Sequence, residues 1–212
     1  MRTIVSSIAM VALVAALNMG ASAQGAPGAP AAGAPQGGAP RGGGGGRGGG
    51  RGFNLPPLLM ETDAFPDGGI IPAKYTGRGG NVQPAFKFSG APATTVSYAI
   101  IFHDVDVALG GNTADVLHWA VWNIPASAMG IPEGKVPDGA VQGGRGSYAG
   151  PGAPAGVRYH HYVFELYALN ANLELDPKAS REEILKAMEG KVVAKAAYVG
   201  RFKGEAAPPA AN

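Results

Sequence analysis

The chain of 212 residues contains no cysteine, and only 15% of its residues are charged. Without cysteine no disulfide can form, but this indicates no particular compartment, because an exported protein can use disulfides but need not. Long apolar runs are also lacking. The mostly apolar stretch at residues 4–17 is shorter than the about 20 residues that a membrane-spanning helix needs. No later stretch is long and apolar enough to span a bilayer.

Residues 1–23 have the parts of a secretory signal peptide. Arg2 gives a positive start, the short apolar stretch follows, and residues 21–23 (Ala-Ser-Ala) supply the small side chains that signal peptidase requires. The predicted cleavage site lies before Gln24. An uncleaved membrane anchor is the alternative, and the shortness of the apolar stretch favours cleavage. We therefore expect an exported protein that is periplasmic or secreted.

The next segment, Gln24–Gly52, consists almost wholly of Gly, Ala and Pro. It has no apolar surface to offset the entropy of ordering its backbone, so it is predicted to be a disordered linker. Arg41, Arg47 and Arg51 stand among its glycines. Arg-Gly repeats can bind nucleic acid, but three arginines without interleaved aromatic residues favour a spacer.

The remainder of the chain has no excess of positive charge. Residues 53–204 hold 13 basic and 14 acidic side chains, a formal charge of −1. The sequence pI of about 8.9 therefore comes from the N-terminal segments. A nucleic-acid-binding domain normally carries its own basic surface, so nucleic acid is excluded as the expected partner. The chain is predicted to end in a flexible tail at residues 205–212.

Within residues 53–204, runs rich in β-branched and aromatic residues alternate with turn clusters. Several runs are nearly continuous in apolar character, as in strands buried inside a sandwich. The fold class is therefore predicted to be mostly β. The predicted strands are Ala85–Ser89, Thr95–Phe102, Val116–Ile124, Tyr159–Leu169 and Val192–Phe202.

One helix is signalled near the C-terminus. Ser180 and Glu183 have the spacing of a capping box, and Gly190 follows as a stop signal. Between them lies an apolar stripe at helical spacing. The stripe consists of Ile184, Leu185 and Met188.

Two long turn-rich stretches, Val105–Asp115 and Pro125–Val157, interrupt the strand pattern. Irregular loops of such length in a compact domain are usually functional or disordered. Polar residues unsuited to a sandwich core flank them. A turn cap for the aspartates and a core position for the first histidine are the alternative interpretations. These polar residues are Asp104, Asp106, His118, His160, His161 and Tyr162.

Ordered motifs in this region resemble a known family. Asp104-Val105-Asp106, followed by residues 118–125 (His-Trp-Ala-Val-Trp-Asn-Ile-Pro), looks like its first signature. Residues 148–154 (Tyr-Ala-Gly-Pro-Gly-Ala-Pro) and 160–164 (His-His-Tyr-Val-Phe) look like the second. From about Phe53 to Lys203 the chain resembles the phosphatidylethanolamine-binding protein family, in its bacterial, Raf-kinase-inhibitor-like branch.

The resemblance implies an antiparallel β-sandwich with a few short helices and a pocket that binds a small anion or phosphorylated head group. It implies no enzymatic activity, catalytic residue, metal or cofactor. Glycine-loop amides can converge on phosphate oxygens, and histidines can donate to them. Alternation places His160 and Tyr162 on one strand face and His161 on the other. The implied ligand-binding residues are Asp104, Asp106, His118, Gly150, Gly152, His160 and Tyr162.

Several positions depart from the family pattern. Its Asp-Pro-Asp-Ala-Pro turn reads Asp-Val-Asp-Val-Ala at residues 104–108, and its Cys-Pro-Pro segment reads Gly-Ala-Pro at residues 152–154. His161 stands where the family has arginine. These changes loosen loops that form the pocket wall and have little effect on the fold.

Two other functions stay open at this point. One is a protein-interaction or inhibitor module with a partner in the cell envelope. The other is a metal-dependent hydrolase that uses the histidines and aspartates, whose side chains suit a metal. The chain has no metalloprotease helix motif, Gly-x-Ser-x-Gly elbow or P-loop. We expect at most peripheral membrane contact, and the sequence leaves a homodimer open.

Overall fold

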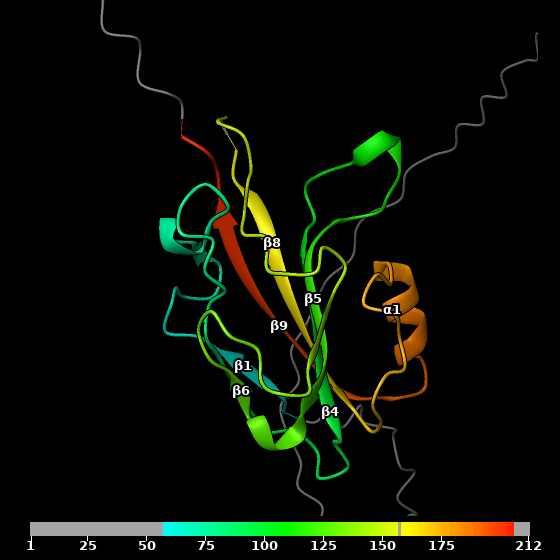
Figure 1. Cartoon of the computed structure of the whole chain (residues 1–212). Coiled ribbons are helices and arrows are strands. Elements are labelled where there is room, and N and C mark those ends of the chain that lie inside the picture. The colour runs from blue at the N-terminus through cyan, green and yellow to red at the C-terminus, as the bar shows by residue number, and fades with distance from the viewer. Residues whose placement is uncertain (1–56, 157, 206–212) are drawn as a thin grey trace, which may run out of the picture. The chain divides into compact units, whose positions relative to one another are not determined.

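The computed structural model describes residues 57–156 and 158–205, which form two sheets and one α-helix in three layers (Figure 1). The predicted signal peptide, the predicted linker and the tail beyond Glu205 lie outside the described residues. In the described part of the chain, no helix is long and apolar enough to cross a membrane. Three short 3-10 turns complete the helical content: η1 (Ala73–Tyr75), η2 (Leu109–Gly111) and η3 (Ala126–Ala128).

The larger sheet has six strands in the order β2-β9-β8-β4-β5-β7. All neighbours are antiparallel except β2 and β9, which are parallel. This sheet contains four of the five predicted strands, with ends shifted by two residues or fewer. Its strands are β2 (Gly69–Ile70), β4 (Ser97–Asp104), β5 (Val116–Pro125), β7 (Val141–Gly143), β8 (His160–Leu169) and β9 (Val192–Phe202).

The smaller sheet has three antiparallel strands in the order β1-β3-β6 and covers one face of the larger sheet. Only its middle strand was predicted, because the other two are too short to show a pattern in the sequence. The predicted β-sandwich is confirmed. The strands are β1 (Leu59–Glu61), β3 (Phe86–Ser89) and β6 (Gly130–Ile131).

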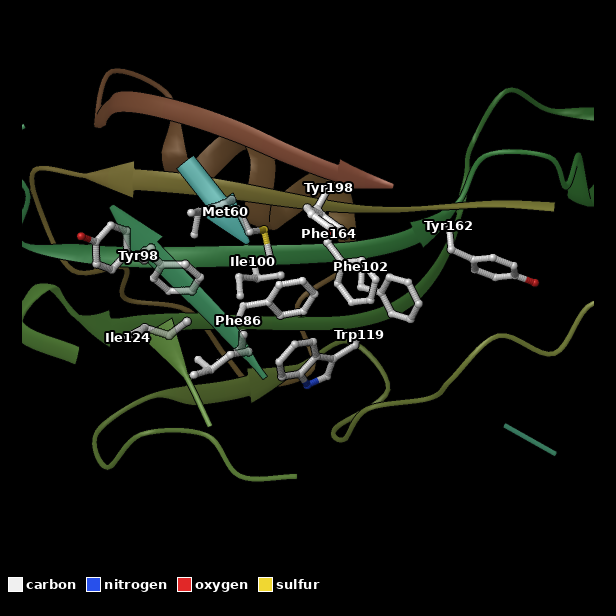
Figure 2. Close-up of a cluster of buried hydrophobic side chains, with 14 of the residues drawn as sticks. Met60, Phe86, Tyr98, Ile100, Phe102, Trp119, Ile124, Tyr162, Phe164 and Tyr198 are labelled. Carbon is white, nitrogen blue, oxygen red and sulfur yellow. The ribbon is translucent and has the colours of Figure 1, made fainter. Parts of the chain in front are cut away.

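Aromatic rings fill the space between the two sheets (Figure 2). Phe102 of β4 and Phe164 of β8 stack with ring centroids 3.9 Å apart, and Phe86 of β3 packs on Phe164 from the small sheet. Burying each such side chain stabilises the fold by roughly 1.5–3 kcal/mol. Tyr162 continues this aromatic row at the end of the sheet, with its ring centroid 6.0 Å from that of Phe102. The packed core therefore holds the Tyr162 ring in place.

The helix α1 (Arg181–Met188) covers the other face of the larger sheet through a second apolar cluster. The predicted capping box is present: the amide of Glu183 donates to the Ser180 hydroxyl at 3.2 Å, and the amide of Ser180 donates to the Glu183 carboxylate at 2.7 Å. Gly190 after the helix has a φ of +72°, which glycine adopts without strain. The predicted helix is therefore confirmed at both ends.

A β-bulge on β5 orients His118. The pairing of β4 with β5 skips this residue, because Phe102 lies opposite Trp119 and the next residue of β4 lies opposite Leu117. A bulge breaks the alternation of side chains and turns one of them toward a new direction. The ring of His118 consequently lies on the sandwich side, with its centroid 5.4 Å from Phe102 and 5.3 Å from Tyr162.

Candidate ligand-binding site

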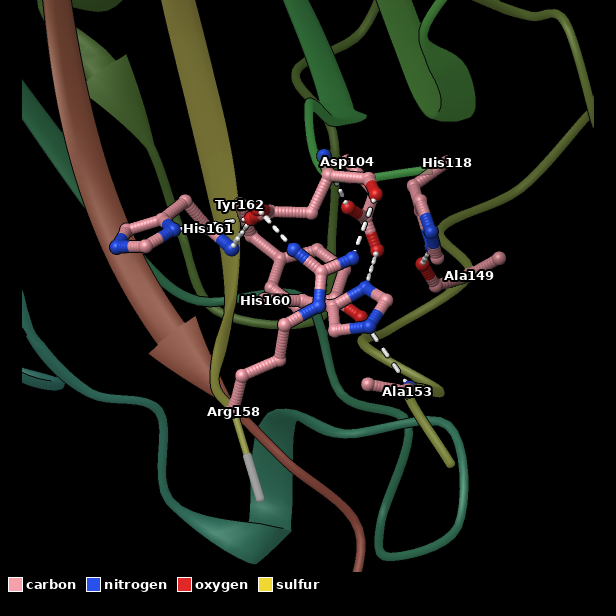
Figure 3. A network of polar contacts seen from close by, with 9 residues as sticks. Asp104, His118, Ala149, Ala153, Arg158, His160, His161 and Tyr162 are labelled. Carbon is pink, nitrogen blue, oxygen red and sulfur yellow. Dashed lines mark hydrogen bonds and ion pairs between the residues drawn. The ribbon is translucent and has the colours of Figure 1, made fainter. Parts of the chain in front are cut away.

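A buried carboxylate lies at the end of strands β4 and β8, at the centre of a polar group (Figure 3). Asp104 pairs with Tyr162 in the register of the two strands, and His160 lies two residues from Tyr162 on the same face. Only 2% of Asp104 is exposed. Its Oδ2 lies 2.8 Å from Nδ1 of His160, and its Oδ1 accepts the backbone amide of Asp106 at 2.9 Å. Both oxygens of the buried carboxylate are thus occupied.

His118 completes the group from β5. Its Nδ1 lies 2.8 Å from the carbonyl oxygen of Ala149. A carbonyl can only accept, so Nδ1 carries a proton. Burial lowers the pKa of His118, against the opposing effects of the Ala149 carbonyl and the Asp104 charge; nearby Arg145 lowers it further. At neutral pH the ring is therefore neutral, with an unprotonated Nε2 that can accept a hydrogen bond.

Tyr162 adds a phenol between the two histidines. Its ring meets that of His118 edge-on and lies nearly parallel to that of His160, with centroids 6.4 Å apart. Its oxygen accepts the amide of Ala153 at 3.2 Å. Burial, and next the negative charge of Asp104, raise the pKa of Tyr162. The hydroxyl therefore stays protonated and can donate its hydrogen. Asp104, His118, His160 and Tyr162 are called the histidine site below.

The two glycines of the predicted site differ in their surroundings. The Gly150 amide already donates to the side chain of Asn81 at 2.8 Å. A Cβ at Gly150 would lie 2.3 Å from the carbonyl oxygen of Tyr75, so glycine is needed here for the close approach of two backbone segments. A Cβ at Gly152 would meet no heavy atom within 4 Å. Gly152 is thus the glycine with open space around it.

Asp106 lies next to the histidine site, and its backbone amide donates to the Asp104 carboxylate. It accepts from Arg158 at 3.0 Å and from the backbone and ring of His161. Burial works against the charged form, but the hydrogen bonds from His161 and the charge of Arg158 outweigh it and lower the pKa of Asp106. His161 is about half exposed on its side chain. Asp106 therefore holds the start of β8 in place rather than joining the inner group.

The structure brings four of the seven predicted residues into one contacting group and places the other three around it. Sequence reasoning did not single out Asn81, Arg158 or the backbone groups of Ala149 and Ala153. Backbone partners have no side-chain signal, whereas Asn81 follows two glycines, which is a turn signal in the sequence. In the structure its φ is +50°. Within residues 57–156 and 158–205, no three His, Asp or Glu side chains are placed to hold one metal ion.

Residues 61–203 match the phosphatidylethanolamine-binding protein family. The chain belongs to this family. The sequence-based resemblance is thus confirmed. A UPF0098 protein of Methanothermobacter thermautotrophicus is 40% identical over 153 residues, which cover 68% of this chain and 97% of that protein. LppC of Mycobacterium tuberculosis, named as a candidate lipoprotein, is 35% identical over 152 residues, which cover 70% of this chain and 73% of the relative.

Solved structures of other family members have the same fold. YbcL of Escherichia coli matches with a TM-score of 0.64 and 26% identity, covering 70% of this chain and 99% of YbcL. The homologue CT736 of Chlamydia trachomatis matches with a TM-score of 0.63 and 29% identity, covering 70% of this chain and 98% of that protein. In this chain, the residues of the histidine site lie within the family match at residues 61–203.

Proposed function

We propose that this family member is a nonenzymatic binding protein that holds a small phosphate-type anion at the histidine site. The proposal rests on one observation: both imidazole rings contact the protein through Nδ1. His160 faces Asp104 through Nδ1, and His118 faces a backbone carbonyl through Nδ1. These contacts leave the Nε2 atom of each ring for a ligand.

The protonation of the site suits a hydrogen phosphate monoester. Asp104 accepts from Nδ1 of His160, so a further proton on that ring resides on Nε2, where it can donate to a phosphate oxygen. Tyr162 can donate its hydroxyl hydrogen to a second oxygen. The neutral Nε2 of His118 can accept the P–OH hydrogen. The monoanion is preferred over the dianion, because the Asp104 charge repels a bare dianion and the dianion has no proton for His118.

Among the four residues of the histidine site there is no serine, threonine or cysteine to act as a nucleophile. Tyr162 is the only hydroxyl group of the histidine site, and its raised pKa keeps it protonated and weakly nucleophilic. The aspartate that could act as a base is buried, and both of its oxygens are engaged. These features support binding rather than hydrolysis.

Export is part of the proposal. The predicted signal peptide and linker would place the domain in the periplasm or outside the cell, and the name of the mycobacterial relative supports an envelope location. In such a place, a phospholipid head group or a free phosphate ester could supply the shared phosphate chemistry. The membrane contact that this requires is peripheral.

Calorimetric titration with phosphoethanolamine and with inorganic phosphate tests the proposal. His118→Gln and His160→Gln should each weaken binding about tenfold or more, the effect of losing one charge-assisted hydrogen bond. His161→Gln is the matched control, because His161 is the neighbouring histidine on the outer face. Equal affinity of all three variants and the unmodified protein, with intact folds, would overturn the assignment.

A further inference from the structure

Two arginines flank the histidine site, one near each imidazole ring. Arg158 precedes His160 by two residues, and Arg145 lies in the turn that follows β7, near His118. We propose that these two guanidinium groups select the ligand of the histidine site, a free phosphate monoester that also carries a carboxylate. This inference rests on the proposed function, because the phosphate would occupy the histidine site while the carboxylate reached the arginines.

Arg158 is hydrogen-bonded into the same network as the buried carboxylate (Figure 3). Its guanidinium donates to Oδ1 of Asp106 at 3.0 Å and to the carbonyl oxygen of Asp106 at 2.9 Å. The backbone amide of Asp106 donates in turn to Asp104 at 2.9 Å. A single residue therefore links this guanidinium to the aspartate that holds the ring of His160.

Arg158 has hydrogen-bond donors left for a ligand. A guanidinium carries five N–H groups, and the two contacts with Asp106 use only two of them. The side chain of Arg158 is 61% exposed. Asp106 also accepts from the backbone and ring of His161, so it stays hydrogen-bonded if Arg158 turns toward a ligand. Exposed ion pairs contribute little stability, and a ligand carboxylate can therefore compete for this arginine.

Arg145 approaches the site from the side of the other histidine. Residues 143–146 form a turn, closed by a hydrogen bond from its last amide to its first carbonyl at 3.3 Å. A Cβ at Gly144 would lie 2.5 Å from the side chain of Leu117, so the turn packs against the residue next to His118. The positive charge of Arg145 accordingly helps to lower the pKa of His118. Within residues 57–156 and 158–205, Arg145 forms no ion pair.

Two guanidinium groups beside a phosphate site favour a second negative charge on the ligand. A carboxylate can accept two parallel hydrogen bonds from one guanidinium, which makes this pairing stronger and more specific than a contact with a neutral group. O-Phospho-L-serine and phosphoethanolamine share the phosphate and the ammonium group. They differ by one carboxylate, so their relative affinity isolates the contribution of the arginines.

Calorimetric titration of the whole mature protein with O-phospho-L-serine and with phosphoethanolamine tests the inference. We expect phosphoserine to bind at least about tenfold more tightly, the effect of gaining one charge-assisted contact. Equal affinity for the two compounds would overturn the inference and leave the proposed anion site standing. Absence of binding of either compound would overturn both.

Variants assign the preference to the two arginines. Arg158→Gln and Arg145→Gln should each bring the affinities for the two compounds closer by several-fold, mainly by weakening phosphoserine binding. Lys186→Gln is the control for net charge, because this exposed lysine lies on α1, across the larger sheet, and it should keep the full preference. An unchanged preference in either arginine variant, or an equal loss of preference in Lys186→Gln, would overturn the inference.

Discussion

Nδ1 of His160 lies 2.8 Å from Oδ2 of Asp104, and the two residues come from neighbouring strands although 56 positions separate them in the chain. The aspartate is buried and its other oxygen accepts a backbone amide, so it cannot turn away from the ring. The pair therefore fixes both the orientation of the imidazole and the nitrogen that faces the protein. The proposed anion site depends on this arrangement.

Acid should destabilise the domain through His118. Its pKa is lowered by burial, so below pH 6.5, the ordinary value, the unfolded chain binds a proton that the folded chain does not. The stability that the neutral His118 ring contributes is fully present above pH 6.5. It declines as the pH falls toward the pKa of His118 in the folded chain. Urea unfolding at pH 7.5 and 5.5 should show a smaller loss of stability for His118→Gln than for the unmodified protein. An identical loss would contradict a buried neutral ring; His161→Gln is the control.

A second pH effect should come from the opposite face of the larger sheet. Burial disfavours the charged form of Glu165, but the contact with Nε2 of His103 at 3.3 Å and the hydrogen bond from Lys195 at 3.1 Å outweigh it and lower the pKa of Glu165 from 4.5 to about 2. The stability that these two contacts give to the charged carboxylate is present above pH 4.5 and is lost as the pH falls toward 2. Glu165→Gln should therefore lower the unfolding free energy by roughly 2 kcal/mol at pH 7 and by much less at pH 2.5.

Chemical denaturation of Glu165→Gln at both pH values checks this effect, with Glu174→Gln as the control. Glu174 forms no ion pair within the described residues. A Glu165→Gln penalty of the same size at pH 2.5 and pH 7 would contradict the expected dependence on the charged carboxylate.

Asn81 should support the histidine site from outside it. Its side chain donates to the carbonyl of Tyr148 at 3.3 Å and accepts the amide of Gly150 at 2.8 Å, and the residue between them, Ala149, holds His118. Asn81→Gly keeps the positive φ without strain and removes both bonds. We expect a loss of about 1 kcal/mol in stability and weaker phosphate binding.

Thermal melts of Asn81→Gly measure the loss of stability, and phosphate titrations of the same variant measure the loss of binding. Asn81→Asp serves as the matched comparison, because it retains the acceptor for the Gly150 amide. If Asn81→Gly binds phosphate as tightly as the unmodified protein, Asn81 has no positioning role.

Local patterns in the sequence were sufficient for most of the fold. The long strands and the helix were predicted because apolar runs and a capping box are signals within a few residues. The bulge at His118 was not, since it depends on how two strands pair. The contacts of Asn81 with Gly150 and of Arg158 with Asp106 join residues 69 and 52 positions apart, and only the folded chain shows them. The family motifs nevertheless predicted the four residues that meet at the histidine site.

The N-terminal segments stay a prediction that two simple measurements check. Mass spectrometry of the exported protein should show a mature chain that begins at Gln24. Deletion of Gln24–Gly52 should leave the melting temperature nearly unchanged, because a Gly-Ala-Pro coil buries little surface and its ordering would cost about 1–2 kcal/mol per residue. A drop of many degrees on deletion would show that this segment packs on the domain.

The central claim is that the Nε2 atoms of His118 and His160 face the ligand while both Nδ1 atoms face the protein. Long-range ¹H–¹⁵N NMR of the histidine rings during a titration with phosphoethanolamine measures this directly. The account predicts large shifts of the two Nε2 signals at saturation, with both Nδ1 signals remaining those of protonated nitrogens and His161 unaffected. Binding that leaves both Nε2 signals unchanged, or that shifts His161 alone, would contradict it.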